Sequence, residues 1–418
     1  MIKLILVGAA SILVKFSSAF AILALSAIVT RHYNPKISGE FFLTLTLVTV
    51  FSALSRLGLD NTLIKNVANH TTSQSIDNPT NLLASSAKLF LCAYAIVVLL
   101  TLAITHTLGS ISLPMPLDTT AIYQMLLCMF MVSISSLCSS YLIGSSRGLI
   151  GSFLLSGLTP LIAALLILAI GDSVPPFQIY MAACLITMSC AIFTIVKCGT
   201  LEFSQPSSLS LLSLAKKSYT FWIIILMQLF IVWSSHLIAA FLLDLEQIAL
   251  LSVAQRVSMA ISFTLIGANF VLAPRFSRYS AKNDYQSLKK ISQVSTRALV
   301  IATLPVYFGI LLFSDEILGF FGTEYVGAKP LLILLCSAQL FSICCGSVGY
   351  LLMMTNSAKS QRNSLVFCAF IVLASSPILI YNYGALGAAI ATSAGIISQN
   401  FLSALLVRKK LGFFTFGK

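Results

Sequence analysis

Twelve long apolar runs are the feature that most constrains how this chain of 418 residues can fold. A helix rises about 1.5 Å per residue, so roughly 20 apolar residues cross a hydrocarbon core of about 30 Å. Hydrophobic residues make up 58% of the chain and charged residues only 9%, whereas soluble domains average about 25% charged residues. The pattern therefore predicts an all-α polytopic membrane protein.

The expected membrane spans are separated by short turns rich in Gly, Pro, Asn and Asp. They are 6–30, 39–64, 83–108, 121–144, 149–170, 177–197, 216–243, 248–273, 290–313, 329–354, 363–382 and 385–407. The first run is too long for a signal peptide and no small-residue cleavage site follows it. We therefore expect it to be retained as the first transmembrane helix.

The basic residues indicate the orientation of the chain in the membrane. Most of the 25 Lys and Arg residues lie at the N-terminus, in the loops after even-numbered spans, or near the C-terminus. Cytoplasmic loops of membrane proteins are enriched in Lys and Arg, which predicts that both termini are cytoplasmic. The net charge of +13 is explained in the same way, and no nucleic-acid partner is expected.

A weak two-fold repeat indicates two domains. The stretch 144–148, between the fourth and fifth spans, and the stretch 355–362, between the tenth and eleventh, are both short, small, polar and basic. We expect an N-terminal six-helix bundle at 1–205 and a C-terminal six-helix bundle at 206–418. Their parallel orientation would relate them by an axis along the membrane normal.

Two cations lie deep inside apolar runs. Lys15 is near the middle of its span, with Ser11 and Ser18 on the same helix face, and Arg256 directly follows Gln255. A cation at the bilayer centre costs between about 2.5 and 17 kcal/mol, so it is expected to face a bundle interior or a wet cavity. The pattern predicts a site for an anionic substrate. The alternatives are a structural ion pair or a snorkelling side chain.

The remaining candidates have two interpretations each. Arg31, at the first outward turn, could be a ligand or an interfacial anchor. Arg56 and Asp60 are four residues apart and could form a helix-end ion pair at the interface, or act as a cytoplasmic gate or an entry site for the substrate. Asp244 could bind a coupling ion or lie in a solvated turn. His236 could titrate near neutral pH or be a hydrogen-bonded packing residue.

Cysteine usage adds no cofactor. The ten cysteines fall mostly in apolar runs, without a CxxC pair or a Cys/His cluster of metal-ligand spacing. We expect them to be small packing residues and expect no metal, cofactor or disulfide.

Seven stretches, taken in order, carry a resemblance to a known family, and most of the chain lies between the first and the last of them. They are 34–41 (Asn-Pro-Lys-Ile-Ser-Gly-Glu-Phe), 56–61 (Arg-Leu-Gly-Leu-Asp-Asn), 252–256 (Ser-Val-Ala-Gln-Arg), 272–275 (Leu-Ala-Pro-Arg), 320–325 (Phe-Phe-Gly-Thr-Glu-Tyr), 351–355 (Leu-Leu-Met-Met-Thr) and 383–389 (Tyr-Gly-Ala-Leu-Gly-Ala-Ala). Together they resemble the Wzx-type polysaccharide flippases of the multidrug/oligosaccharidyl-lipid/polysaccharide (MOP) exporter superfamily. Asn356 departs from the Gly that many relatives have there.

The resemblance implies two six-helix bundles around a central cationic cavity and an alternating-access cycle coupled to an ion gradient. It implies that the chain translocates undecaprenyl-diphosphate-linked oligosaccharide across the bacterial inner membrane for O-antigen or capsule synthesis. The implied protein partners are a polysaccharide polymerase and a chain-length regulator.

We expect the diphosphate to bind cavity cations. The predicted substrate-binding residues are Lys15, Arg256, Arg56 and Arg31, and the predicted gate or ion-coupling residues are Asp60, Asp244 and His236.

Two other functions compete with a flippase. A membrane polymerase or ligase of the same pathway would need a catalytic group of side chains in a sizeable outward loop, and the outward loops here are short. A multidrug exporter of cationic drugs would favour buried carboxylates, whereas the charges deep in these spans are positive. A peptidoglycan-precursor flippase usually has more helices. No catalytic residue is therefore expected.

Overall fold

The protein is helical throughout the part that the structure, a computed structural model, describes: residues 2–70, 79–108, 119–145, 147–197, 211–355 and 357–416. Its α-helices are α1 (Ile2–His32), α2 (Pro35–Ser55), α3 (Leu59–His70), α4 (Pro79–Leu108), α5 (Thr119–Gly144), α6 (Gly148–Ser156), α7 (Leu158–Ile170), α8 (Pro176–Lys197), α9 (Leu211–Leu242), α10 (Leu245–Ala281), α11 (Tyr285–Leu312), α12 (Ser314–Gly319), α13 (Lys329–Cys345), α14 (Val348–Met354) and α15 (Ala358–Leu411). Two 3-10 turns, η1 (Gly171–Ser173) and η2 (Thr323–Ala328), join them. The all-α class predicted from the sequence is confirmed.

The chain forms two compact units. The N-terminal unit comprises Leu13–Leu25 and Thr44–Leu226, and the C-terminal unit comprises Met1–Ile12, Ser26–Leu43 and Met227–Lys418. The predicted division between 1–205 and 206–418 falls outside the described residues and stays a prediction.

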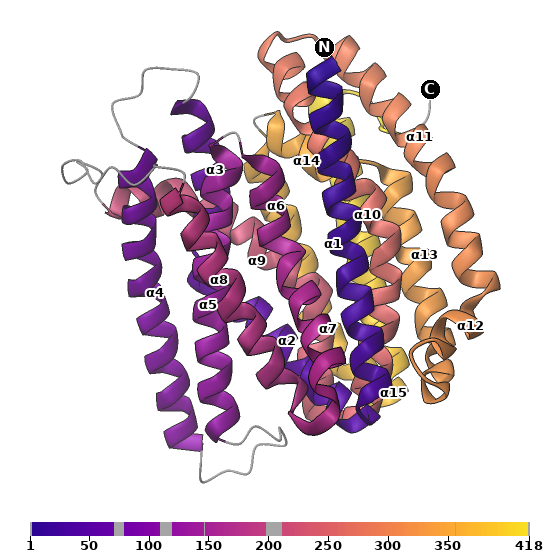
Figure 1. The fold of residues 1–418 in the computed structure, drawn as a ribbon. Helices are drawn as coiled ribbons and strands as arrows, with labels where there is room; N and C mark the ends of the chain where they lie inside the picture. The colour runs from indigo at the N-terminus through magenta and orange to yellow at the C-terminus, as the bar shows by residue number, and fades with distance from the viewer. Residues whose placement is uncertain are drawn as a thin grey trace. The chain divides into compact units, whose positions relative to one another are not determined.

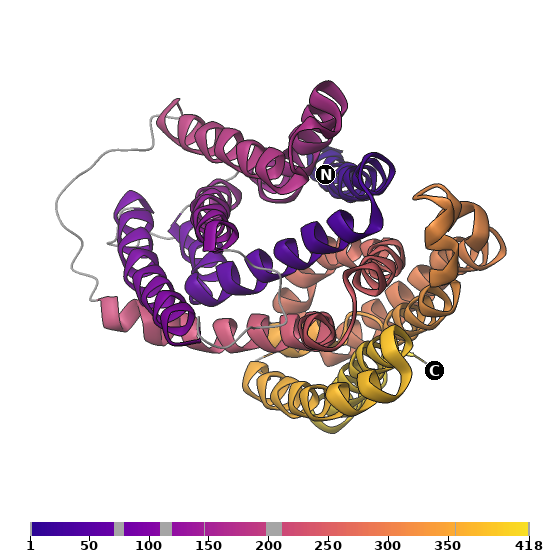
Figure 2. The same cartoon turned by 90° about the horizontal axis from the view of Figure 1, so that it is seen from below.

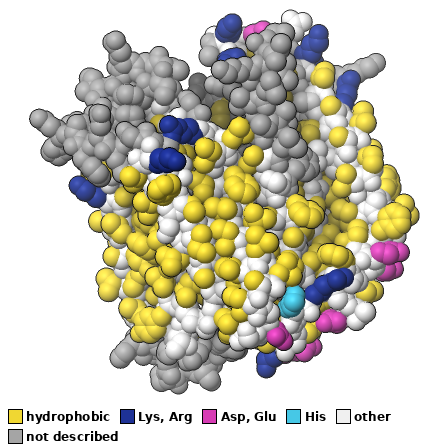
Figure 3. Space-filling view, viewed as in Figure 1, with side chains coloured by type: hydrophobic (Ala, Val, Ile, Leu, Met, Phe, Trp, Pro, Cys, Tyr) yellow, Lys and Arg dark blue, Asp and Glu magenta, His cyan; other side chains and the backbone are white. Residues whose placement is uncertain are grey.

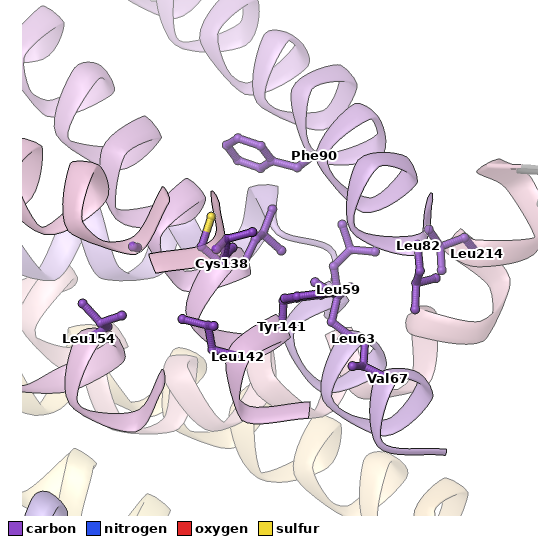
Figure 4. Packing of buried hydrophobic residues seen from close by; sticks show 13 residues of the cluster. Leu59, Leu63, Val67, Leu82, Phe90, Cys138, Tyr141, Leu142, Leu154 and Leu214 are labelled. Atoms are coloured by element: carbon purple, nitrogen blue, oxygen red, sulfur yellow. The ribbon is translucent and has the colours of Figure 1, made fainter. Parts of the chain in front are cut away.

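Helix α5 is central in the N-terminal unit. It packs against α3, α4, α6 and α8, and Figure 1 shows α3, α4, α5 and α8 next to one another. Thirteen buried residues form the core between these helices, ten of them labelled in Figure 4; they include Leu63, Phe90 and Leu142, each 0% exposed. Their close packing fixes where the polar groups of the same helices lie.

Helix α13 is central in the C-terminal unit, where it packs against α10, α11 and α15. Figure 2 shows these helices, coloured from salmon red to yellow, from below. A cluster around Phe276, Leu288 and Leu352 joins α10, α11 and α14 to the end of α15. The two units are therefore each held by a core of their own.

Large apolar side chains are exposed on the outer surfaces of both units. Examples are Phe20 and Leu99 in the N-terminal unit and Leu312 and Phe370 in the C-terminal unit. Figure 3 shows hydrophobic side chains covering the middle of the visible face, with charged side chains at its edges. Many serines and threonines are buried instead. This distribution is that of a protein whose surrounding solvent is lipid.

Nine of the described helices are long and apolar enough to cross a membrane, and the bent pair Gly148–Ser156 and Leu158–Ser173 adds a tenth. The twelve spans predicted from the sequence exceed these ten for two reasons. In α1 the apolar stretch whose side chains are described, Ser17–His32, is shorter than a full membrane span. In addition, α15 has 54 residues and a break at Gly384, where the backbone leaves helical geometry. At about 1.5 Å per residue α15 is far longer than one span, and its two arms correspond to the predicted spans 363–382 and 385–407.

The predicted span 39–64 is not one continuous helix. It ends as α2 at Ser55 and resumes as α3 at Leu59, because Leu57 (φ 49°) and Gly58 (φ 72°) adopt the left-handed region. A Cβ on Gly58 would lie 2.6 Å from the Trp222 backbone nitrogen and 3.0 Å from the Ser218 carbonyl oxygen. Glycine therefore permits both the turn and the close approach of α9.

We predict that Gly58→Ala lowers the free energy of unfolding by about 1–3 kcal/mol, because it adds a clash to an unfavourable backbone conformation. Gly171→Ala tests the conformation alone, since Gly171 has φ 73° but open space around it. Gly148→Ala is the neutral control, with neither constraint. Chemical unfolding of the purified protein in mixed micelles measures all three. Equal stabilities of the Gly58 and Gly148 variants would contradict the close approach.

Candidate functional site

The break between α2 and α3 positions Arg56 in the N-terminal unit. A helix end leaves backbone carbonyls without partners, which is costly where water is excluded. The Trp222 indole Nε1 donates to the Leu54 carbonyl at 3.1 Å, and the Thr62 and Ser218 hydroxyls are 2.9 Å apart. Both contacts tie the break to α9, so Arg56 leaves the helix at a fixed point.

Arg56 is held in a polar network. Its Nε lies 2.7 Å from Asp60 Oδ2, and its Nη1 donates to Ser52 Oγ at 3.0 Å. The Ser136 hydroxyl on α5 donates to Asp60 Oδ1 at 3.2 Å. The Arg56 and Asp60 side chains are 14% and 19% exposed. The structure thus shows the ion pair that the sequence spacing suggested, formed across the helix break rather than along one helix.

A pocket of about 160 Å³ lies beside this network. Helices α2, α5, α7 and α8 line it, together with the Arg56 turn and Leu155 of α6. The lining residues are Thr49, Ser52, Arg56, Val132, Ser135, Ser136, Leu155, Thr159, Tyr180 and Cys184. Six of these carry hydroxyl groups, so the pocket is a polar hollow within an apolar bundle.

Arg256 is the centre of a second cluster, in the C-terminal unit. It lies roughly 16 Å along α10 from the start of that helix, well inside the span. Its guanidinium carbon is 4.5 Å from the centre of the Phe42 ring on α2, a cation–π contact. The helices approach closely here, because a Cβ on Gly39 would overlap the Leu245 carbonyl. Gly39 thereby permits the close approach of α2 to the start of α10.

His236 and Gln255 belong to the same cluster. His236 on α9 is 1% exposed and close enough to Arg256 to interact electrostatically. The Leu251 carbonyl approaches the ring without hydrogen-bond geometry, and neither ring nitrogen has a hydrogen-bond partner. Gln255 is 0% exposed, and both polar atoms of its amide also lack partners. Whether His236 titrates or serves as a packing residue therefore stays a prediction.

The other predicted residues lie elsewhere. Arg31 donates from Nε to the Phe320 carbonyl at 2.7 Å and stacks on the Phe320 ring at 4.5 Å, so it joins α1 to the end of α12. Asp244 is exposed in the turn between α9 and α10. The side chain of Lys15 is outside the described residues. Its role as a ligand stays a prediction.

Two features were not identified from the sequence. The hydroxyl pocket was missed because Ser and Thr in apolar helices usually bond their own helix backbone, although the serine-rich run 133–140 was a signal. The Phe42 contact needs the fold. Among the described residues no group of three or more His, Cys, Asp and Glu side chains could hold a metal ion.

No family model matches the chain. Over 132 residues it is 31% identical to the probable low-salt glycan biosynthesis flippase Agl15 of Haloferax volcanii. The match covers 31% of this chain and only 28% of that protein. It is a partial likeness and does not by itself assign an activity.

Solved structures match almost the whole chain. An inward-facing MATE-family multidrug resistance transporter of the MOP superfamily has a TM-score of 0.71 at 12% identity, covering 96% of this chain and 98% of that one. The lipid II flippase MurJ in an inward closed conformation has a TM-score of 0.72 at 14% identity, covering 95% and 87%. The chain therefore has the multi-pass helical fold shared by these two transporters.

We predict that the Arg56–Asp60 pair contributes a coupling energy of about 1–3 kcal/mol, because both side chains are mostly buried and hydrogen-bonded. A double-mutant cycle of Arg56→Ala and Asp60→Ala measures it, with unfolding followed in mixed micelles.

The pair Lys329–Asp315 is the matched control. It has the same separation of 2.7 Å, but its side chains are 42% and 55% exposed. Its coupling is expected to stay below about 1 kcal/mol. Equal coupling in the two pairs would show that the burial of Arg56 and Asp60 has no energetic role.

Proposed function

We propose that this protein translocates a lipid-linked oligosaccharide across a membrane by alternating access. The observation that best supports this proposal is the cluster of Arg256, His236 and Gln255. It places a cation inside apolar helices, together with four buried polar atoms of His236 and Gln255 that have no hydrogen-bond partner. Such atoms are costly unless a partner reaches them at some stage. A polar substrate that enters and leaves supplies that partner transiently.

The sign of the charge favours an anionic group. A guanidinium matches the geometry of phosphate oxygens and remains charged at depth. The Gln255 amide and a neutral His236 each offer a donor as well. A diphosphate on a lipid carrier fits this chemistry, while the hydrocarbon tail stays in the bilayer. The likeness to a probable glycan biosynthesis flippase supports a glycan as the cargo.

The full proposal follows the resemblance found in the sequence. The substrate is an undecaprenyl-diphosphate-linked oligosaccharide of O-antigen or capsule synthesis, and the location is the bacterial inner membrane with both termini cytoplasmic. The protein partners are a polysaccharide polymerase and a chain-length regulator. The chain itself acts as a transporter and not as an enzyme.

Among the three candidates for ion coupling, we propose His236. Asp60 is bonded to Arg56 and Ser136, and Asp244 is exposed in a turn. His236 is buried next to Arg256, so a rearrangement that opens the imidazole to water and moves it away from Arg256 would let it accept a proton.

Deletion of the gene in its host tests the proposed function. Loss of surface polysaccharide, with single lipid-linked repeat units trapped on the cytoplasmic leaflet, is the expected result. Surface glycan limited to one repeat unit would instead identify a polymerase. Unchanged glycan with altered drug tolerance would identify a multidrug exporter, and either result overturns the proposal.

We predict that Arg256→Ala reduces translocation at least about tenfold, because it removes charge-assisted hydrogen bonds to the diphosphate. Arg256→Lys should restore part of the activity, since the charge remains. Complementation of the deletion strain, scored by surface polysaccharide, measures both. Arg278→Ala is the matched control, because Arg278 is an exposed arginine in the last turn of the same helix. Equal complementation by both alanine variants would exclude a substrate role for Arg256.

We also predict that His236→Asn abolishes the response of translocation to an imposed pH gradient, while Arg256-dependent substrate binding remains. Inside-out vesicles with and without a pH gradient measure this response. An undiminished response in the variant would remove His236 as the coupling residue.

A further inference from the structure

The geometry points to the pocket beside Arg56 as a subsite for one uncharged sugar ring of the transported glycan, and not for its diphosphate. This inference rests on the proposed function and adds the chemical class that the N-terminal unit recognises. It rests on the hydrogen-bonding inventory, the charge and the size of the pocket.

The hydroxyl groups of the pocket offer mainly acceptor oxygens. Thr49 donates its hydrogen to the Leu45 carbonyl and Ser52 to the Thr49 carbonyl. Thr159 donates to Thr187 at 3.0 Å. Ser136 donates to Asp60, as described above. A hydroxyl that has donated its hydrogen keeps acceptor lone pairs. Ser52 Oγ already accepts from Arg56, so the oxygens of Thr49, Ser136 and Thr159 are the ones that call for a ligand with donors.

A phosphate does not meet that requirement. Its oxygens are acceptors, so they would face the acceptor oxygens of the pocket. The Arg56 charge is already matched by Asp60 at 2.7 Å, and Arg56 is the charged residue among those that line the pocket. The Arg56–Asp60 pair has no net charge, which weakens the attraction of the pocket for an anion.

A sugar ring can bond both the acceptor oxygens of the pocket and the donors of Arg56, since each sugar hydroxyl both donates and accepts. Its O–H groups can bond the acceptor oxygens of Thr49, Ser136 and Thr159. The oxygens of the sugar can accept from the Arg56 guanidinium. Among the described residues, only two of its nitrogens have hydrogen-bond partners: Nε donates to Asp60 and Nη1 donates to Ser52. The match of donors to acceptors is what distinguishes a sugar from phosphate here.

The size and the walls of the pocket also fit one ring. Its volume is about 160 Å³, and an engineered cavity of about 150 Å³ holds one benzene molecule. Val132 and Leu155 provide apolar wall for the C–H face of a ring, and Tyr180 provides an aromatic surface. A pyranose with its hydroxyl groups is larger than benzene, so one ring is the most that the pocket can hold, and two linked rings exceed it.

Saturation-transfer NMR on the purified full chain tests the subsite. The probes are glucose, galactose, mannose and N-acetylglucosamine, in a detergent without a sugar headgroup, and inorganic pyrophosphate is the competitor. At least one sugar should show saturation transfer that pyrophosphate does not displace. No transfer from any of the four, or displacement by pyrophosphate, overturns the assignment.

Two matched pairs of variants locate the binding. Thr159→Val removes a pocket oxygen without changing shape, and the loss of one hydrogen bond should cut binding about fivefold. Thr194→Val makes the same change on α8 at an exposed hydroxyl bonded to its own helix, and binding should persist. Ser135→Leu fills the pocket and should abolish transfer. Ser189→Leu, exposed on α8, should not. Equal behaviour within both pairs overturns the assignment.

Surface polysaccharide in the host separates the two claims. Loss of glycan in the deletion strain together with loss in the Ser135→Leu strain supports both. If deletion removes the glycan while Ser135→Leu leaves it at the wild-type level, the subsite is wrong and the flippase assignment stands. If deletion leaves the glycan unchanged, the proposed function itself fails.

Discussion

The need to satisfy every polar group inside an apolar helical bundle is the constraint on which the rest of this structure depends. In hydrocarbon an unpaired carbonyl or charge has no water to bind. The α2–α3 break is tolerated because Trp222 bonds the Leu54 carbonyl, and Arg56 is tolerated because Asp60 and Ser52 bond it. The helix break and Arg56 thus both have hydrogen-bond partners, which Trp222, Asp60 and Ser52 provide.

The C-terminal unit contrasts with this arrangement. Arg256 lies over the Phe42 ring, but the neighbouring His236 and Gln255 have buried polar atoms without hydrogen bonds. A fully satisfied network rigidifies a bundle, whereas an incompletely satisfied one marks a site that another molecule completes. The two units therefore present different chemistry. One pocket is rich in hydroxyls and its arginine is paired, and the other cluster is cationic and incomplete.

Much of the architecture could be predicted from the sequence, because the apolar runs and the distribution of Lys and Arg follow from the cost of placing charge in lipid. The break at Gly384 was predicted from its turn residues, and the pairing of Arg56 with Asp60 was anticipated from their spacing. The break at Leu57 and Gly58 was not, since it depends on the approach of Trp222 from a helix far along the chain. The hydroxyl pocket likewise joins side chains of five helices, and no local pattern specifies such a meeting. The contact of Arg31 with Phe320 is likewise specified by no local pattern, and the predicted role of Arg31 stays a prediction.

The most direct test of the central claim is a leaflet-accessibility measurement on the purified chain in liposomes. Fluorescent undecaprenyl-diphosphate-linked oligosaccharide is placed in both leaflets, and a membrane-impermeant glycosidase is added outside. Translocation by the protein predicts that all of the glycan is cleaved with time, because inner-leaflet substrate reaches the enzyme. Cleavage that stops at the outer-leaflet fraction, as in protein-free liposomes, would contradict the account.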